Sequence, residues 1–232
     1  MDHLNKHICG MCGKPCDGDR EFHVLCPECQ AKENERIRQI RLEEHMEAVQ
    51  RGIENSGIPR RYMPEAPYVP FVYDWMMKHP GKNIMLDGET GSGKSTSAGV
   101  LARHAIEGGV SVSYTQMYKL LDGWRDARRS DEPYGAERFL NSIERADLLI
   151  IDEIADKNTC TESTQECMWR LLEDIYNGTC RARVVMLGNL YAGFIRDVFG
   201  CDGPARRRLR ACFLIGRIDT DSQTITELNN IE

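Results

Sequence analysis

One glycine-rich stretch in the middle of the chain has the residue types and spacing that bind phosphate groups. Residues 88–95 read GETGSGKS and match the pattern G-x-x-x-x-G-K-[ST] at every position. Glycines let consecutive backbone N–H groups point at phosphate oxygens. Lys94 would reach the β- and γ-phosphates, and the Ser95 hydroxyl would bind Mg²⁺. The stretch therefore predicts an ATP and Mg²⁺ site formed by Gly88, Glu89, Thr90, Gly91, Ser92, Gly93, Lys94, Ser95 and Thr96.

The segments on either side of this stretch are those that such a site needs. Residues 83–86 (NIML) form a short apolar run typical of a buried strand. Apolar residues recur at helical spacing from residue 93 to 106, and Gly108 and Gly109 end the predicted helix. The start of that helix would add positive potential at the phosphates. A glycine-rich turn that binds nothing is the alternative, and this strand–loop–helix context argues against it.

Acidic and polar residues follow two further apolar runs. Residues 148–151 precede Asp152 and Glu153, and residues 184–187 precede Gly188 and Asn189. Beside a phosphate loop, Asp152 would hold Mg²⁺ and Glu153 would act as the general base for an attacking water. Asn189 would bond the γ-phosphate or the water, or it is an ordinary turn residue. We expect catalysis to involve Lys94, Asp152, Glu153 and Asn189.

Paired cysteines near the N-terminus indicate a second kind of chemistry. Two C-x₂-C pairs supply four thiols, those of Cys9, Cys12, Cys26 and Cys29, at a spacing close to that of structural zinc sites. The segment is too short and polar to bury a core, so Zn²⁺ binding would supply its folding free energy. Free thiols or a redox pair are the alternative. The spacing also leaves open that one ligand is instead Cys16, His7 or His23.

Arginines gather in two places. Three follow a tryptophan in a predicted helical stretch from 117 to 145 that is interrupted at 130–133: Trp124, Arg125, Arg128 and Arg129. Single-stranded nucleic acid suits such a group, with charge on phosphates and a ring under a base; a solvated helix end is the alternative. Four more arginines lie within 206–210. They would grip phosphates or complete a neighbouring subunit's nucleotide site.

A charged stretch from 31 to 53 has no proline and no glycine before Gly52. Leu42, Met46, Val49 and Ile53 form one stripe of a predicted amphipathic helix. This helix either packs on a partner or is a solvated connector. Prolines between 59 and 70 mark a boundary after it. We therefore predict a zinc module at 1–30, a linking helix at 31–56 with a partner-binding face, and an ATPase domain at 57–232.

Length and charge restrict the class of protein. The 232 residues suffice for one α/β domain and a small module. A net charge of -6 argues against a generally basic nucleic-acid-binding surface. The longest apolar runs are too short to span a bilayer. The first residues lack the apolar region of an export signal, so we expect a cytoplasmic protein with reduced thiols.

With these residues in place, the chain resembles the AAA+ ATPases of the bacterial helicase-loader family, the DnaC and DnaI type with their phage-encoded relatives. The resemblance rests on residues 57–62 (GIPRRY), the loop at 88–95, residues 147–153 (DLLIIDE), residues 188–190 (GNL) and the arginines of 206–210. It implies that Lys94 and Ser95 belong to Walker A, and that Asp152 and Glu153 belong to Walker B. It further implies that Asn189 is sensor 1 and that Arg208 is the arginine finger. Arg206 or Arg207 are alternative registers for the finger. The stretch from Trp124 to Arg129 matches an insertion that contacts single-stranded DNA.

The resemblance implies an α/β fold, an AAA+ P-loop NTPase core with a parallel sheet of order 5-1-4-3-2 and no C-terminal helical lid. It implies an ATP-dependent loader that self-associates and places a hexameric replicative helicase on single-stranded DNA, without a membrane. No sensor 2 arginine is apparent, which predicts a weak ATPase stimulated by a partner or DNA. The alternatives are a transposition helper ATPase of the IstB type and a non-catalytic ATP-binding adaptor. Glu153 argues against the adaptor, because a protein that only binds ATP needs no base.

Overall fold

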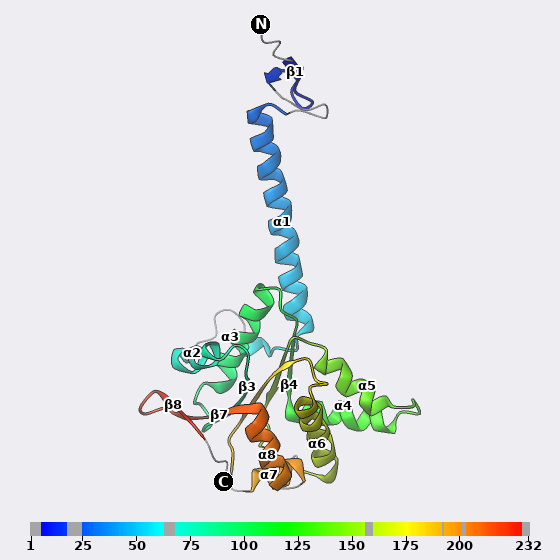
Figure 1. Ribbon diagram of the computed structural model, residues 1–232, viewed down its shortest axis with the longest axis vertical. Coiled ribbons are helices and arrows are strands. Elements are labelled where there is room, and N and C mark those ends of the chain that lie inside the picture. Colours follow the sequence, from blue (N-terminus) through cyan, green and yellow to red (C-terminus); the bar gives the residue numbers. More distant parts are fainter. Residues whose placement is uncertain are drawn as a thin grey trace. The chain divides into compact units, whose positions relative to one another are not determined.

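The computed structural model describes residues 6–17, 25–62, 68–155, 160–191, 193–200 and 203–228. The chain forms two compact units, Met1–Gln50 and Arg51–Glu232 (Figure 1). The long helix α1 (Pro27–Asn55) overlaps the stretch 31–56 of the predicted linking helix, and the boundary between the two units falls within it. Among the described residues, no helix has the length and apolar character needed to span a membrane.

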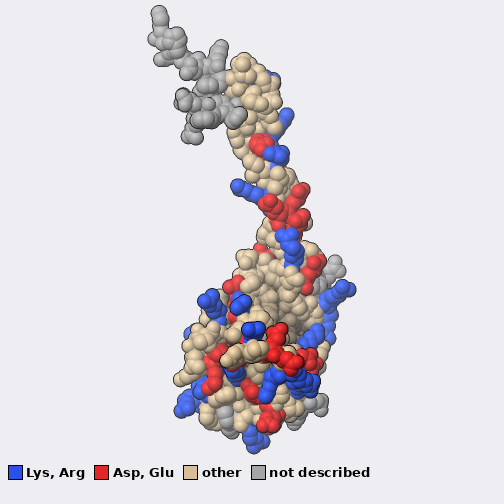
Figure 2. Space-filling view, turned by 90° about the vertical axis from the view of Figure 1, so that its right-hand side faces the viewer, with Lys and Arg blue, Asp and Glu red and all other residues tan. Residues whose placement is uncertain are grey.

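The smaller unit contains a two-stranded sheet and most of α1. Strands β1 (Lys6–Ile8) and β2 (Pro15–Asp17) pair antiparallel. Cys29 is the one buried residue of α1, and Leu42 and Met46 of the predicted stripe are exposed. On the face seen in Figure 2, acidic and basic side chains are interspersed along this helix. Charged residues of both signs keep its surface hydrated, as expected for a helix that buries little of its own surface.

The larger unit is built on a six-stranded sheet of order β4-β5-β6-β3-β7-β8. The neighbouring strands run parallel except β7 and β8, which pair antiparallel. With the strand before the phosphate loop counted as the first, this confirms the predicted order 5-1-4-3-2, and β8 is an addition at one edge. The strands are β3 (Asn83–Asp87), β4 (Val112–Gln116), β5 (Leu148–Asp152), β6 (Arg183–Gly188), β7 (Phe213–Asp219) and β8 (Thr224–Glu227).

The alternating residues 110–114 (VSVSY) predict a strand, and the observed strand begins two residues later, at Val112. The amide of Val110 donates to the Ala105 carbonyl at 2.9 Å and so closes the end of the preceding helix instead of joining the sheet. Strand β4 therefore starts at Val112 and ends at Gln116, which pairs with Asp152 of β5. This register places the last residue of β4 beside the acidic end of β5.

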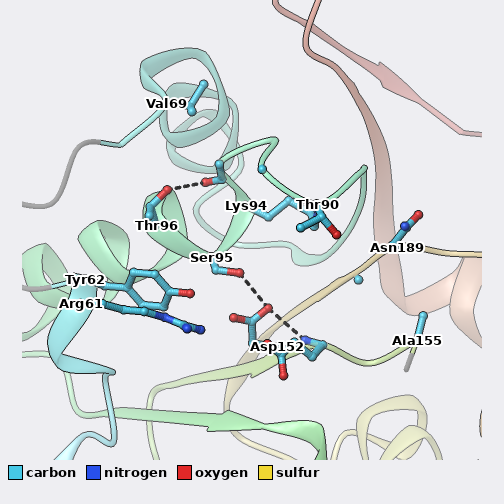
Figure 3. Close-up of a pocket in the computed structure, with 14 residues that line it drawn as sticks. Arg61, Tyr62, Val69, Thr90, Lys94, Ser95, Thr96, Asp152, Ala155 and Asn189 are labelled. Carbon is cyan, nitrogen blue, oxygen red and sulfur yellow. Dashed lines mark hydrogen bonds between the residues drawn. The ribbon is translucent and has the colours of Figure 1, made fainter. Parts of the chain in front are cut away.

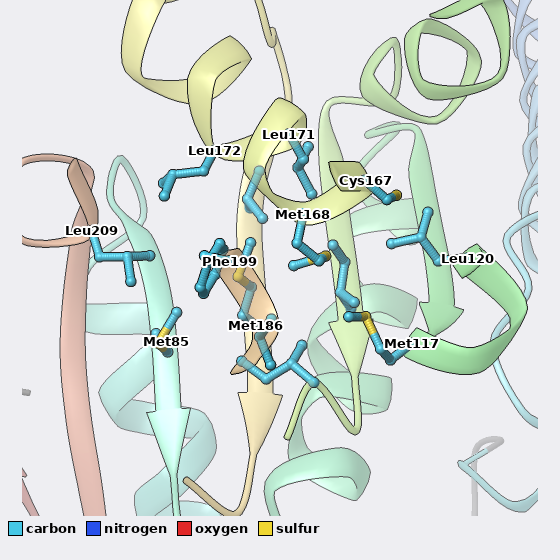
Figure 4. Packing of buried hydrophobic residues seen from close by; sticks show 14 of the residues in the cluster. Met85, Met117, Leu120, Cys167, Met168, Leu171, Leu172, Met186, Phe199 and Leu209 are labelled. Carbon is cyan, nitrogen blue, oxygen red and sulfur yellow. The ribbon is translucent and has the colours of Figure 1, made fainter. Parts of the chain in front are cut away.

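Helices cover both faces of the sheet. On one face, α3 contacts β4 and β5, and α2 packs on α3. On the other face, apolar residues of α4, α6, α7 and α8 form one core with the sheet (Figure 4), in which Met168 and Leu172 of α6 share a cluster with Met85 and Met186. The helical elements are η1 (Arg60–Tyr62), α2 (Pro70–Lys78), α3 (Lys94–Glu107), α4 (Met117–Arg129), α5 (Gly135–Glu144), α6 (Glu162–Asn177), α7 (Phe194–Phe199) and α8 (Gly203–Cys212).

Helix α6 begins with a cap formed by two threonines. Its first turn is closed by Thr161 and Thr164, each of which accepts the backbone N–H of the other. A capping box formed by Ser163 and Glu166, as the sequence pattern suggests, is wrong because the helix starts earlier and Glu166 pairs with Arg128. The hydroxyl of Thr164 takes the place of the usual Glu or Gln side chain.

Candidate active site

The glycine-rich loop joins β3 to α3, as the sequence predicts. Gly93 adopts a positive φ of 85° just before the first residue of α3. A side chain there would also be blocked, because a Cβ atom would lie 2.1 Å from a methyl carbon of Val69. Only glycine combines this backbone conformation with such a close neighbour. The loop can therefore turn directly into the N-terminus of α3, where backbone N–H groups favour an anion.

Lys94 is buried at this turn and its amino group folds back on the loop. The Nζ atom donates to the carbonyl oxygens of Gly88 and Glu89 and to the Ser92 hydroxyl, at 2.5, 2.8 and 3.1 Å. Burial lowers the pKa of Lys94, and the negative charge of Asp152 opposes that fall. The amino group is thus held among loop acceptors, in reach of any phosphate that the loop binds.

Asp152 links the loop to the neighbouring part of the sheet. Its Oδ1 accepts from the Ser95 hydroxyl at 3.0 Å, and its Oδ2 accepts from the Tyr114 hydroxyl at 2.8 Å. Asp152 and Tyr114 are both buried. Burial, and next the charge of Asp152, raise the pKa of Tyr114, so this hydroxyl stays a donor. A hydroxyl and a carboxylate in this arrangement are the oxygen ligands that Mg²⁺ prefers, and both residues fit the predicted ion.

Glu153 follows at the exposed end of β5. It has a positive φ of 63°, a conformation that non-glycine residues rarely adopt. Its backbone N–H donates to Asp152 Oδ1 at 2.9 Å, and Gln116 donates to Glu153 Oε2 at 3.3 Å. The backbone turn separates the directions of two consecutive acidic side chains. Asp152 is buried against Ser95 and Glu153 is exposed, and both line the cavity described next.

These residues surround a cavity of about 850 Å³. Figure 3 shows Arg61 and Tyr62 at one end of it and Asn189 and Ala155 at the other, with Lys94 and Thr90 of the loop between them. The Arg61 guanidinium lies 4.8 Å from the centre of the Tyr62 ring. A phosphate loop beside a cation suits a nucleoside triphosphate, whose phosphates the loop would hold.

The structure brings together most of the predicted site residues. Those lining the cavity are Thr90, Gly91, Gly93, Lys94, Ser95, Thr96, Asp152, Glu153 and Asn189. Of the remaining loop residues, Gly88 and Glu89 instead line an adjoining cavity of about 730 Å³, which also contacts Asn189. Ser92 faces a third cavity beside α2 and is bonded to Lys94.

The predicted arginine finger lies against its own domain. The Arg208 guanidinium stacks 4.2 Å from the Trp169 ring centre and donates to Glu173 at 3.2 Å. Arg207, one residue earlier on α8, is exposed. Arg208 does not line the cavity of its own protomer. Its role as an arginine finger in the nucleotide site of a neighbouring protomer stays a prediction.

One residue of the predicted DNA-binding group is wrongly assigned. Trp124 is 2% exposed and belongs to the main core, so its ring is not available to stack on a base. The period of α4 points Trp124 inward with Leu120 and Leu121. Arg128 and Arg129 are exposed, and Arg128 pairs with Glu166 while Arg125 donates to Thr161. The three arginines remain candidates for phosphate contacts.

The cysteine pairs of the smaller unit converge. The ligand atoms of Cys9, Cys12, Cys26 and Cys29 all lie within 4.8 Å of one another. The sulfurs of Cys12 and Cys26 are 3.7 Å apart, close to the ~3.8 Å that tetrahedral zinc with ~2.3 Å Zn–S bonds requires. The Cys26 backbone N–H donates to Cys9 Sγ at 3.3 Å, which lowers the pKa of Cys9 to about 6 and favours the thiolate. These four residues fit a structural zinc ion.

The alternative zinc ligands have different positions. Cys16 is buried beside the four-sulfur cluster but lies outside the group whose ligand atoms converge. The side chain of His7 and the whole of His23 fall outside the described residues.

Several site residues have no assigned role in the sequence interpretation. Tyr114 and Gln116 reach the acids only because β4 pairs with β5 in the observed register. The alternation of residues 110–114 predicts a strand but not its neighbour. Tyr62 belongs to the GIPRRY segment, yet its place at the cavity depends on packing against Gly99 of α3, where a Cβ would lie 2.6 Å from the Cβ of Tyr62.

Three solved structures share the fold of the larger unit. AMPPCP-bound DnaA from Aquifex aeolicus has a TM-score of 0.56 at 15% identity and covers 72% of this chain and 53% of that chain. A DNA replication initiation factor has a TM-score of 0.50 at 16% identity, covering 64% and 44%. The DnaC helicase loader has a TM-score of 0.50 at 12% identity, covering 63% and 86%. The present chain thus spans about half the length of the first two.

Sequence comparison adds the family. No curated protein matches this chain. The family model described as IstB-like ATP binding protein matches residues 68–202, which include the phosphate loop, Asp152, Glu153 and Asn189. The match covers more than half of the chain, and the site within it has the geometry described above. The chain therefore belongs to the family of IstB-like ATP binding proteins, and its larger unit has the α/β fold of the three structures above, with a phosphate loop between β3 and α3.

Proposed function

We propose that this protein is an ATP-dependent helicase loader that binds a hexameric replicative helicase and helps to place it on single-stranded DNA in the bacterial cytoplasm. The observation that carries the ATPase part is the hydrogen bond between Ser95 and Asp152 beside the buried Lys94. A phosphate loop and an acidic strand end meet there at one cavity, with a second carboxylate at its edge.

Each residue of the cavity has a distinct task in this proposal. The loop N–H groups and Lys94 bind the phosphates, and Ser95 with Asp152 would hold Mg²⁺. The ion would neutralise charge on the phosphate oxygens. Glu153 accepts a proton from water, and Asn189 orients that water or the γ-phosphate. Tyr114 fixes the second oxygen of Asp152, so that carboxylate keeps one orientation.

Self-association would complete the site with an arginine from α8 of a neighbouring protomer. Arg208 would have to leave Glu173 and Trp169 to reach another protomer, whereas Arg207 is exposed. We therefore favour Arg207 as the finger, with Arg208 holding α8 on α6. The activity of the isolated protein is expected to be weak and to rise with DNA or the helicase.

The helicase-binding part of the proposal rests on the smaller unit. A converging four-cysteine cluster and exposed apolar side chains on α1, Ile37, Ile40, Leu42 and Met46, offer a small rigid module and a surface for a protein partner. A loader has a use for both, since it must hold the helicase while the ATPase domain changes state.

A transposition helper ATPase is the second candidate, and the family match favours it. Both candidates share the ATPase chemistry and differ in the partner. Co-purification of the full chain with a replicative helicase and, separately, with a transposase distinguishes them. Capture of the transposase alone would reject the loader.

The ATPase part is tested by Lys94→Ala. We expect this variant to lose binding of a fluorescent ATP analogue while it keeps its folding transition and its helicase binding. Lys82→Ala, an exposed lysine before β3, is the matched control and should bind the analogue normally. Normal nucleotide binding by Lys94→Ala would show that the site is wrongly assigned.

A further inference from the structure

A buried carboxylate lies directly before the phosphate loop, and no catalytic pattern accounts for it. Asp87 is the last residue of β3 and is 4% exposed. Its Oδ1 accepts from the backbone N–H of Leu190 at 2.9 Å, and its Oδ2 accepts from Arg217 Nε of β7 at 2.6 Å. A buried carboxylate needs such partners, because an unpaired one carries a large desolvation cost.

Two hydrogen bonds hold the residues on either side of Asn189. On one side, the Gly188 carbonyl accepts from the Gly88 N–H at 3.2 Å. On the other side, the Leu190 N–H donates to Asp87. The residues before and after Asn189 are therefore both hydrogen-bonded to the end of β3 and the start of the phosphate loop. Strand β6 ends at Gly188, so Asn189 no longer pairs with a neighbouring strand. The bond from Leu190 to Asp87 takes the place of the next hydrogen bond between the strands.

Asp87 acts from outside the nucleotide cavity. It lines the adjoining cavity together with Arg217, and Asn189 lines both cavities. Asp87 is not among the residues that line the main cavity, but its bond to the Leu190 N–H holds the backbone next to Asn189. Its charge also favours the protonated form of Lys94, whose pKa burial lowers.

We propose that Asp87 is a positioning residue for ATP hydrolysis, which holds Asn189 against the phosphate loop, and that Arg217 is its counter-ion. This inference rests on the proposed ATPase function. The Leu190 bond is the essential part, and the Arg217 ion pair holds the buried carboxylate in one orientation. A shift of about 1 Å in a group that orients a reactant can lower a rate by up to about 100-fold.

The test is a double-mutant cycle on ATP hydrolysis by the full chain, with Asp87→Ala, Asn189→Ala and the combination. We expect Asp87→Ala to lower kcat by about tenfold or more while KM for ATP changes little, because Lys94 and Ser95 remain. In the Asn189→Ala background, Asp87→Ala should cause no further loss, because the two residues act through one group. Asp87→Asn keeps an oxygen acceptor for Leu190 and should recover most of kcat.

Asp147→Ala is the matched control. Its carboxylate accepts from the Ser111 backbone N–H at 3.0 Å, before the start of β5 and so at the opposite end of the strands. It should leave kcat unchanged. Asp87→Ser keeps a polar group that is too short to reach Leu190, and it replaces Asp87→Ala in the cycle if that variant does not fold.

The outcomes separate the two proposals. A wild-type protein that neither binds nor hydrolyses ATP refutes the proposed function itself. An active wild type with an unchanged Asp87→Ala variant refutes only the positioning role. If the losses in kcat multiply in the double variant, the positioning role is also refuted, because Asp87 then acts independently of Asn189.

Discussion

The hydroxyl of Ser95 donates to Oδ1 of Asp152 at 3.0 Å, although 57 positions separate the two residues in the chain. Ser95 belongs to the first turn of α3 and Asp152 ends β5, and β6 lies between β3 and β5 in the sheet. The contact therefore crosses over the end of β6. One hydrogen bond thus joins the proposed phosphate site at the start of α3 to the proposed acidic residues at the end of β5, and this pair is where an ion would be held.

Ser95→Ala should separate magnesium binding from nucleotide binding. We expect ATP hydrolysis to fall at least tenfold, by loss of an ion ligand, while nucleotide affinity in the absence of Mg²⁺ stays close to that of the wild type. Hydrolysis rates and affinities measured across a Mg²⁺ titration check this. Ser142→Ala, which removes an exposed hydroxyl bonded within α5, is the control. Equal losses of affinity with and without Mg²⁺ would contradict an ion-binding role for Ser95.

Zinc content should depend on four cysteines and not on their buried neighbour. We expect native mass spectrometry of the full chain to find one zinc ion bound per chain, and Cys26→Ser to lose it, because three thiolates and a hydroxyl hold zinc poorly. Cys16→Ser should retain zinc, and so should the control Cys212→Ser in the larger unit. Loss of zinc from Cys16→Ser would instead make Cys16 a ligand.

Single-stranded DNA binding should depend on the arginines at the end of α4 and not on the tryptophan. Arg129→Ala is expected to weaken binding uniformly across sequences and to lower the salt dependence of log K by about one. Trp124→Phe should leave affinity unchanged, since the ring is buried. Fluorescence anisotropy at several salt concentrations measures both, with the exposed Arg196→Ala of α7 as control. An Arg129→Ala variant that behaves like this control would refute the assignment.

The stability of the larger unit should vary with pH through Glu144. This residue is buried at the end of α5, and burial, then the charge of Asp174, raise its pKa from 4.5 to about 7. The folded state thus holds a proton that the unfolded state releases between about pH 4.5 and 7. The contribution to the free energy of unfolding is present below pH 4.5 and is lost as pH rises through 7.

Glu144→Gln keeps the shape of the side chain and removes the titration. We expect urea unfolding to show this variant more stable than the wild type at pH 8, by on the order of 1–3 kcal/mol, and equal to it at pH 4.5. The exposed Glu132→Gln is the control and should show no such pH dependence. A constant difference between Glu144→Gln and wild type at all pH values would contradict the assignment.

The sequence predicts the phosphate site well because the loop pattern determines its own geometry. Residues 88–95 form a turn between a strand and a helix whose glycines and lysine act locally, so few long-range contacts are needed. The strand order is also correct, since the family resemblance supplies the topology. The pairing of Ser95 with Asp152 then follows from two strand ends that meet at the same edge.

What the sequence does not predict depends on register and on the direction of helix faces. Trp124 is wrongly placed because arginines beside an aromatic residue suggest a binding surface, while the helical period of α4 turns that ring into the core. Tyr114 and Asp87 require knowledge of which strand lies beside which, at single-residue precision. Tyr114 bonds Asp152, 38 residues away in the sequence, and Asp87 bonds Leu190, 103 residues away.

The positive φ of Glu153 has a consequence for evolution of the larger unit. An L-residue in the left-handed region costs on the order of 1 kcal/mol relative to glycine, and the value here is 63°. A chain selected for robustness alone would place Gly at this position. The end of β5 is instead followed by a glutamate in this conformation, so the native state is weakened at a position where a carboxylate lines the cavity.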